Sequence, residues 1–251
     1  MPSDGDLLDQ LLARCTFPAA GTAVICAVSG GADSLALLAL ACRSDLNVTA
    51  VHVDHGIRAD SATEATVVAA AAEQFGARFR AETVVVEPGS DLENRARQAR
   101  HRVLGPDAMT GHTADDQAET LLINLLRGAG LDGIAAMERG FRHPILALRR
   151  SETVELCVRV GLSPVDDPSN RDPRFVRNRI RHEVLPLLAD ISNRDPVPLL
   201  TRTADHARRV TADLDTLAAA HDPTDCRVLA SAVPSVAHQA LRRWLQSTTG
   251  Y

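Results

Sequence analysis

Apolar and polar positions in the first half of the chain alternate in blocks that predict strands and helices in turn. Continuous or alternating apolar runs predict strands at residues 23–28, 48–54, 79–86 and 107–110. Helical spacing predicts helices between them, at residues 34–41, 62–75, 92–104 and 114–126. The first two strands are nearly continuous apolar runs, which is typical of strands covered on both faces. The pattern therefore predicts an α/β fold with a doubly wound parallel sheet.

The pattern changes after about residue 140, where the strands stop and helices follow one another. Helical spacing appears at residues 152–160, 175–188, 201–218 and 236–246, and a Pro/Asp/Asn-rich loop precedes the second of these. We therefore predict a catalytic domain over residues 1–190 and a small, abbreviated helical domain over residues 191–251.

Composition excludes several classes of protein. No apolar stretch approaches the roughly 18 residues that a membrane span needs, and the acidic first residues lack the basic start of a signal peptide. The five cysteines are scattered, odd in number and without a C-x-x-C pair, which argues against a disulfide framework, a zinc site or an iron–sulfur cluster. We expect a cytoplasmic protein that has no membrane partner, and the sequence leaves a homodimer open.

The charges are unevenly distributed and contain no lysine. Every basic residue is arginine, so a Walker-type phosphate loop, which needs a lysine, is excluded. Residues 1–138 hold 10 Arg against 19 Asp and Glu, whereas residues 139–181 hold 10 Arg against 5. A basic segment beside an acidic body suggests a bound polyanion, and a solvated arginine-rich surface explains it equally well.

The segment SGGADS follows the first predicted strand and starts the first predicted helix. Its residues are Ser29, Gly30, Gly31, Ala32, Asp33 and Ser34. Glycine permits a close backbone approach, and the start of a helix attracts an anion. The hydroxyl groups of Ser29 and Ser34 add hydrogen-bond donors for such an anion, and Asp33 can hold a divalent cation that bridges phosphates. A plain turn capped by Ser or Asp is the alternative.

The segment GHTADDQAET follows the fourth predicted strand and places His112 at the strand end. Asp116 and Glu119 are three residues apart, so their carboxylates share one helix face. Such a pair suits Mg²⁺ or the orientation and deprotonation of an attacking amine. The alternative is that these acidic residues only stabilise the helix, because negative charges in a first turn interact favourably with the helix dipole.

Two arginine-rich segments are candidates for contact with phosphates. Arg97 and Arg100 lie one turn apart on a predicted helix, and Arg174, Arg177 and Arg181 are spaced to form one stripe on another. Such a stripe can follow a nucleic-acid backbone, and an ordinary exposed basic face is the alternative.

Five segments in order resemble one family. SGGADS resembles the SGGxDS signature of the PP-loop ATP pyrophosphatases, whose fold is of the adenine-nucleotide α-hydrolase type. HVDHGIR, ENRARQARH, GHTADDQAETLLINLLRGAG and DPSNRDPRFVRNRIRHEVLPLL narrow the resemblance to the tRNA(Ile)-lysidine synthase family. His101 stands where that family usually has Tyr, and the resemblance covers roughly residues 20–190.

The resemblance implies a ligase that uses ATP and Mg²⁺. It would adenylate the wobble cytidine (C34) of tRNA(Ile) with a CAU anticodon and join free L-lysine to its C2. The residues that match the family's catalytic and substrate-orienting positions are His112, Asp116, Glu119 and Arg100. Those that match its tRNA-binding segments are Arg97, Arg174, Arg177, Asn178 and Arg181. Two alternatives remain: thiolation of a tRNA base by the same adenylation chemistry, or a non-catalytic nucleotide-binding module.

Overall fold

The central sheet is parallel and four-stranded, as the sequence predicts. The computed structural model describes residues 4–54, 61–84 and 102–249. Within them the strand order is β3-β2-β1-β4, with Ala23 of β1 paired to Asn47 of β2 and Cys26 of β1 paired to Met109 of β4. The bounds are Ala23–Ala27 (β1), Asn47–Asp54 (β2), Arg78–Thr83 (β3) and Met109–Thr110 (β4).

This strand order determines where a ligand can bind. The chain leaves β1 towards β2 on one side and later returns to pair β4 on the other side of β1. Such a reversal opens a crevice at the carboxyl ends of the two strands. The segments after β1 and β4, SGGADS and GHTADD, therefore lie side by side at one edge of the sheet.

The helix after the glycine turn forms the centre of the core. Helix α2 (Ala32–Arg43) packs between the sheet and α7 (Arg150–Arg159), so it is apolar on all sides. Leu35, Leu37, Leu38 and Leu40 are completely buried. Helix α3 (Ser61–Gln74) packs on β2 and β3 beside α2, and α1 (Asp4–Leu12) packs on α7. The turn that starts α2 is thereby held on a rigid support.

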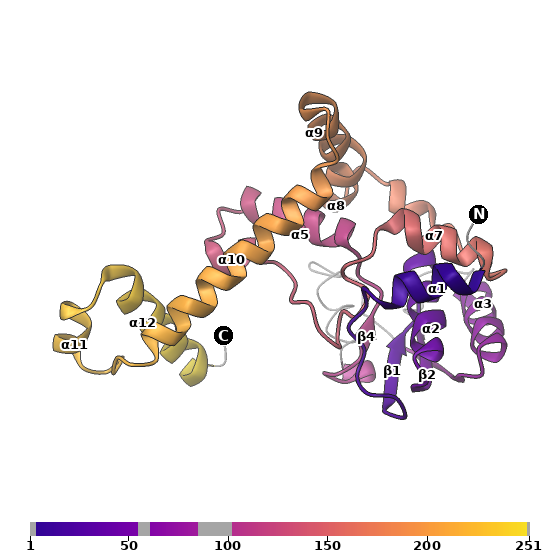
Figure 1. The fold of residues 1–251 in the computed structure, drawn as a ribbon, viewed down its shortest axis with the longest axis horizontal. Helices are drawn as coiled ribbons and strands as arrows, with labels where there is room; N and C mark the ends of the chain where they lie inside the picture. Colours follow the sequence, from indigo (N-terminus) through magenta and orange to yellow (C-terminus); the bar gives the residue numbers. More distant parts are fainter. Residues whose placement is uncertain (1–3, 55–60, 85–101, 250–251) are drawn as a thin grey trace.

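The rest of the chain is helical and extends away from the sheet (Figure 1). Helix α5 (Ala114–Leu126) and the short α6 (Leu131–Ile134) pack against the long α10 (Pro196–Ala218). At the far end of α10 lie α11 (Cys226–Ser231) and α12 (Pro234–Thr249). The structure thus has a helical C-terminal region, although the domain boundary at residue 190 stays a prediction.

The helix predicted over residues 175–188 is divided in the structure. It consists of α8 (Val176–Arg179), a π-helical turn over Ile180–Val184, and α9 (Leu185–Ser192). A π-helical turn shifts the phase of the side chains that follow it, and such turns are frequent at functional sites. In the described part of the chain, no helix is both long and apolar enough to cross a bilayer.

Candidate active site

A cleft of about 930 Å³ lies at the carboxyl ends of β1, β2 and β4. Residues from both polar segments line it, together with side chains of β2, α7 and the loop that precedes α8. The lining includes Ser29, Gly31, Asp33, Ser34, His52, His112, Asp116, Arg150 and Arg181. The cleft therefore joins the predicted phosphate-binding turn to Asp116, one member of the predicted acidic pair.

The glycine turn is held by its own hydrogen bonds. Ser34 Oγ accepts from the Ser29 N–H at 3.1 Å and donates to the Gly31 carbonyl at 2.8 Å. Gly30 has a φ of +89°, which favours glycine, and its carbonyl accepts from the Val165 N–H at 3.0 Å. Among the described residues, no side chain caps α2. The N–H groups at the start of α2 are thus available to an anion.

Gly111 allows the end of β4 to contact this turn directly. A Cβ atom at position 111 would lie 2.7 Å from the Asp33 carbonyl oxygen and 2.9 Å from the Ser34 nitrogen. Backbone therefore packs on backbone, and only glycine fits. This contact fixes the distance between the glycine turn and His112.

One arginine bridges the acidic residues from both polar segments. The Arg150 guanidinium donates to Asp33 at 3.3 Å, to Glu119 at 3.0 Å and to Asp116 at 2.8 Å. Thr153, one turn further along α7, donates to the other oxygen of Asp33. Asp33, Asp116 and Glu119 thus belong to one cluster, although they come from α2 and α5.

Two arginines from the α8 region complete this cluster. Arg181 donates from Nε and Nη2 to Glu119, at 2.7 and 3.0 Å, and Arg177 lies 3.4 Å from the same carboxylate. Glu119 is completely buried, so its charge is compensated entirely by guanidinium groups. We refer to Asp33, Asp116, Glu119, Arg150, Arg177 and Arg181 as the ion-pair cluster.

The predicted arginine stripe is not present in that form. Arg174 lies in the turn before α8, is highly exposed and pairs with Asp172. Arg177 and Arg181 are four residues apart, share one helix face and both contact Glu119. Asn178 is buried and donates to the Ser169 and Asp172 carbonyls, which holds the preceding loop in place. Arg97 and Arg100 lie outside the described residues.

The environment shifts the pKa values of Asp33 and Asp116 in opposite directions. Burial raises the pKa of Asp33, and the nearby charge of Asp116 adds to this effect. Burial also opposes ionisation of Asp116, but Arg150 and His112 and the hydrogen bonds from Thr113 outweigh it and lower its pKa. The carboxylates in turn raise the pKa of Arg150 against the effect of burial. Asp116 therefore stays ionised more readily than Asp33.

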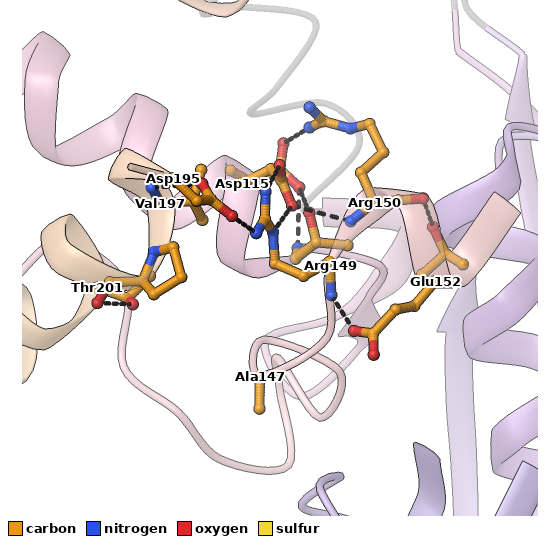
Figure 2. Close-up of polar contacts among 12 residues, drawn as sticks. Asp115, Ala147, Arg149, Arg150, Glu152, Asp195, Val197 and Thr201 are labelled. Carbon is orange, nitrogen blue, oxygen red and sulfur yellow. Dashed lines mark hydrogen bonds and ion pairs between the residues drawn. The ribbon is translucent and has the colours of Figure 1, made fainter. Parts of the chain in front are cut away.

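A second set of contacts joins the site to the helical region. Figure 2 shows Arg149 between Asp115 of α5 and Asp195, the residue that caps α10. Asp115 also accepts the Arg150 backbone N–H at 2.9 Å, and these contacts lower its pKa although burial opposes this. Asp115 therefore contacts Arg149 and the backbone of Arg150, which fixes the start of α7.

Histidine side chains line two further parts of the cleft. The Thr110 hydroxyl lies 2.7 Å from His112 Nδ1 and 2.8 Å from His143 Nδ1, which holds the two rings edge to face. His52 is buried, with Nδ1 3.0 Å from the Val28 carbonyl. Its Nε2 has no hydrogen-bond partner among the described residues. A buried orphan nitrogen beside the glycine turn suits a polar ligand atom.

Sequence reasoning missed four of these side chains: Arg149, Arg150, His143 and His52. The paired arginines at the end of the segment HPILALRR, directly before a helix, were the signal available for the first two. Nothing in local spacing links them to Asp33 or Glu119. Those contacts arise only when α7 packs on α2.

Comparison with solved structures supports the fold. The U34-tRNA thiolase NcsA from Methanococcus maripaludis superposes with a TM-score of 0.62, covering 81% of this chain and 79% of that one. Sequence identity is 16%, so the likeness concerns the fold alone. A family model described as a PP-loop domain matches residues 7–188.

Curated relatives identify the family more narrowly. The tRNA(Ile)-lysidine synthase of Nocardia farcinica is 43% identical in an alignment of 246 residues that covers 91% of this chain and 77% of that protein. The Rhodococcus jostii protein of the same name is 41% identical over 87% of this chain and 72% of its own length. The Mycobacterium leprae protein of the same name is 39% identical over 87% of this chain and 73% of its own length. The chain therefore belongs to the tRNA(Ile)-lysidine synthase family of PP-loop ligases.

Proposed function

We propose that the chain adenylates O2 of the wobble cytidine in CAU-anticodon tRNA(Ile) and joins lysine to C2 of that base. The observation that carries this proposal is the single cleft shared by the glycine turn and Asp116. One part of the cleft suits the phosphates of ATP, and the other suits the ammonium group of lysine. The two half-reactions can then proceed without transfer between sites.

The glycine turn would bind the pyrophosphate part of ATP. The N–H groups at the start of α2 and the hydroxyl group of Ser29 supply donors, and the helix dipole favours the negative charge. His52 lines the same cleft and would contact the nucleoside part. Asp33 would hold Mg²⁺ together with phosphate oxygens, since Mg²⁺ commonly takes one or two carboxylates plus substrate phosphates. When bound, Mg²⁺ would neutralise charge on the departing pyrophosphate.

Adenylation converts a poor leaving group into a good one. The cytidine O2 would attack the α-phosphorus, and the bond to pyrophosphate would break. His112 would stabilise the charge that develops at that phosphate from its place in the cleft. We keep Arg100 as a candidate for the same role from its match to the family's motif. The lysine amine, after giving up a proton to the Asp116 carboxylate that binds it, would then attack C2, and AMP would leave with O2.

The contacts of Asp116 and Glu119 on α5 support different roles for these two carboxylates. Asp116 lines the cleft and has a lowered pKa, so it would bind the lysine ammonium group as a carboxylate. Glu119 is completely buried and contacts Arg150, Arg177 and Arg181. It would act as a positioning residue that holds these arginines at the wall of the cleft.

We expect Arg177→Ala to weaken tRNA binding more than it slows turnover at saturating tRNA. Arg177 is 41% exposed, so its guanidinium can reach a phosphate while it rests on Glu119. Loss of one phosphate contact should reduce the salt slope of log K by about 1. Filter binding of tRNA(Ile) at several salt concentrations measures this slope. Arg227→Ala, a change at an exposed arginine on α11, serves as the control. An unchanged slope with strongly reduced turnover would assign Arg177 to catalysis instead.

The thiolation alternative receives little support from the cysteines. All five lie in described residues, and in that part of the chain no three Cys, His, Asp or Glu side chains form a metal-binding group. Burial raises the pKa of Cys15 and Cys157 to about 12, so these thiols are poor nucleophiles at neutral pH. The exposed Cys226 is on α11.

The test is AMP release from ATP in the presence of CAU-anticodon tRNA(Ile), with lysine omitted or added. The proposal predicts sustained AMP release only when tRNA and lysine are both present. Release that needs a sulfur donor instead would indicate thiolation. ATP binding without AMP release under any of these conditions would indicate a non-catalytic module.

A further inference from the structure

The ion-pair cluster is neutral because three carboxylates face three guanidinium groups. Arg150 is the member that contacts Asp33, Asp116 and Glu119 together. Its backbone is fixed by the bond to Asp115, but the guanidinium lies at the end of a long side chain. The position of that group is therefore set by the charges around it rather than by the helix.

The carboxylate oxygens of Asp33 and Asp116 at the cleft already accept hydrogen bonds. The oxygens of Asp33 accept from Thr153 and Arg150, and those of Asp116 accept from Thr113 and Arg150. A cation that approaches Asp33 or Asp116 must therefore compete with Arg150. Removing Arg150 with no substitute would leave buried negative charges uncompensated, which is costly.

The phosphates of ATP supply another partner for Arg150. Arg150 lines the same cleft as Ser29, Gly31 and Ser34, which form the glycine turn. A guanidinium group bonds phosphate oxygens in a bidentate manner, with charge-assisted hydrogen bonds. An anion on the turn would therefore attract Arg150, while the cations of the reaction would replace it at the carboxylates.

We propose that Arg150 is an ATP ligand that moves from Asp33 and Asp116 to the phosphates when ATP binds. This inference rests on the proposed function, because it assigns the phosphates of ATP to this cleft. The exchange keeps the charges balanced: phosphate compensates Arg150, and the carboxylates become free for cations. Occupation of the glycine turn would thereby prepare Asp116 for the lysine ammonium group.

The test is equilibrium binding of ATP and of adenosine, with magnesium present and without tRNA or lysine. We expect Arg150→Met to weaken ATP binding roughly 10- to 100-fold, because charge-assisted hydrogen bonds are lost. Arg150→Lys keeps the charge and should weaken it less. Adenosine binding should stay close to that of the wild type, because adenosine has no phosphate. Unchanged ATP binding, or an equal loss for adenosine, would overturn the proposal.

Arg159→Met is the matched control. Arg159 lies on the same helix, its side chain is 23% exposed against 25% for Arg150, and it pairs with Glu155. ATP binding should not change in this variant. If Arg150→Met does not fold, a crystal structure of the wild-type protein with a non-hydrolysable ATP analogue decides the matter. The guanidinium is expected on the phosphates, and its retention on all three carboxylates would refute the exchange.

The two proposals fail in different ways. If wild-type protein releases no AMP with tRNA and lysine, the proposed function is wrong regardless of Arg150. If wild-type protein turns over normally while Arg150→Met binds ATP as tightly as the wild type, only the role of Arg150 is wrong.

Discussion

Replacing Asp33 by alanine is expected to abolish AMP release. Asp33 lies at the start of α2, beside the N–H groups that would receive the phosphates, and its carboxylate is the proposed Mg²⁺ ligand. Loss of such an electrostatic group costs roughly 10²–10³-fold in turnover, or more where a cation is lost with it. The measurement is the rate of ATP conversion to AMP with tRNA(Ile) and lysine. Normal turnover in Asp33→Ala would show that the glycine turn has been assigned wrongly.

The Asp33→Asn variant separates the expected loss of AMP release from any change in the stability of the fold. Burial raises the pKa of Asp33, so its ionised form destabilises the fold. The stabilising contribution of the protonated form is complete below the unfolded-state pKa and is lost as pH rises through the folded-state pKa. The Asn variant should therefore melt no lower than wild type at neutral pH, although it is inactive. Asp9→Ala, at an exposed residue of α1, is the control for both measurements.

Gly111→Ala is expected to lose both activity and stability. The new Cβ would lie 2.7 Å from the Asp33 carbonyl oxygen, and neither strand end nor helix start can shift freely. Overpacking of this kind costs about 1–3 kcal/mol of the free energy of unfolding. A displacement of about 1 Å at the glycine turn would reduce turnover roughly 100-fold. Thermal unfolding and AMP release measure the two effects.

Gly130→Ala provides the matched control for this substitution. Gly130 has a φ of −75°, and a Cβ atom added there would have no described atom within 4 Å, so alanine fits. The melting temperature and turnover of this variant should remain those of the wild type. If Gly111→Ala behaves in the same way, the close contact between β4 and the glycine turn has no functional role.

Much of the fold follows from local patterns in the sequence. The predicted helix over residues 114–126 matches α5, because Thr113 and Asp116 form a capping box and the apolar spacing is regular. The predicted start of α10 at residue 201 is five residues late, because Asp195 caps the helix and Pro196 occupies its first position.

Local sequence patterns predict only some of the residues that form the site. SGGADS and GHTADDQAET identify Asp33, Asp116 and Glu119, and the order of the strands brings them to one edge of the sheet. The contact between Arg150 and Asp33 could not be predicted, because the two residues are 117 positions apart along the chain. The sequence likewise does not show that Arg177 and Arg181, expected on a surface stripe, contact Glu119 of another helix. Contacts between distant segments depend on packing, which periodicity does not encode.

The most direct measurement is the mass of nucleoside 34 after reaction. CAU-anticodon tRNA(Ile) is incubated with the protein, ATP, magnesium and isotope-labelled lysine, then digested and analysed by mass spectrometry. The proposed function predicts a cytidine that carries one labelled lysine joined with loss of water, together with one AMP released per modified base. An unmodified cytidine, or one whose oxygen has been replaced by sulfur, would contradict it.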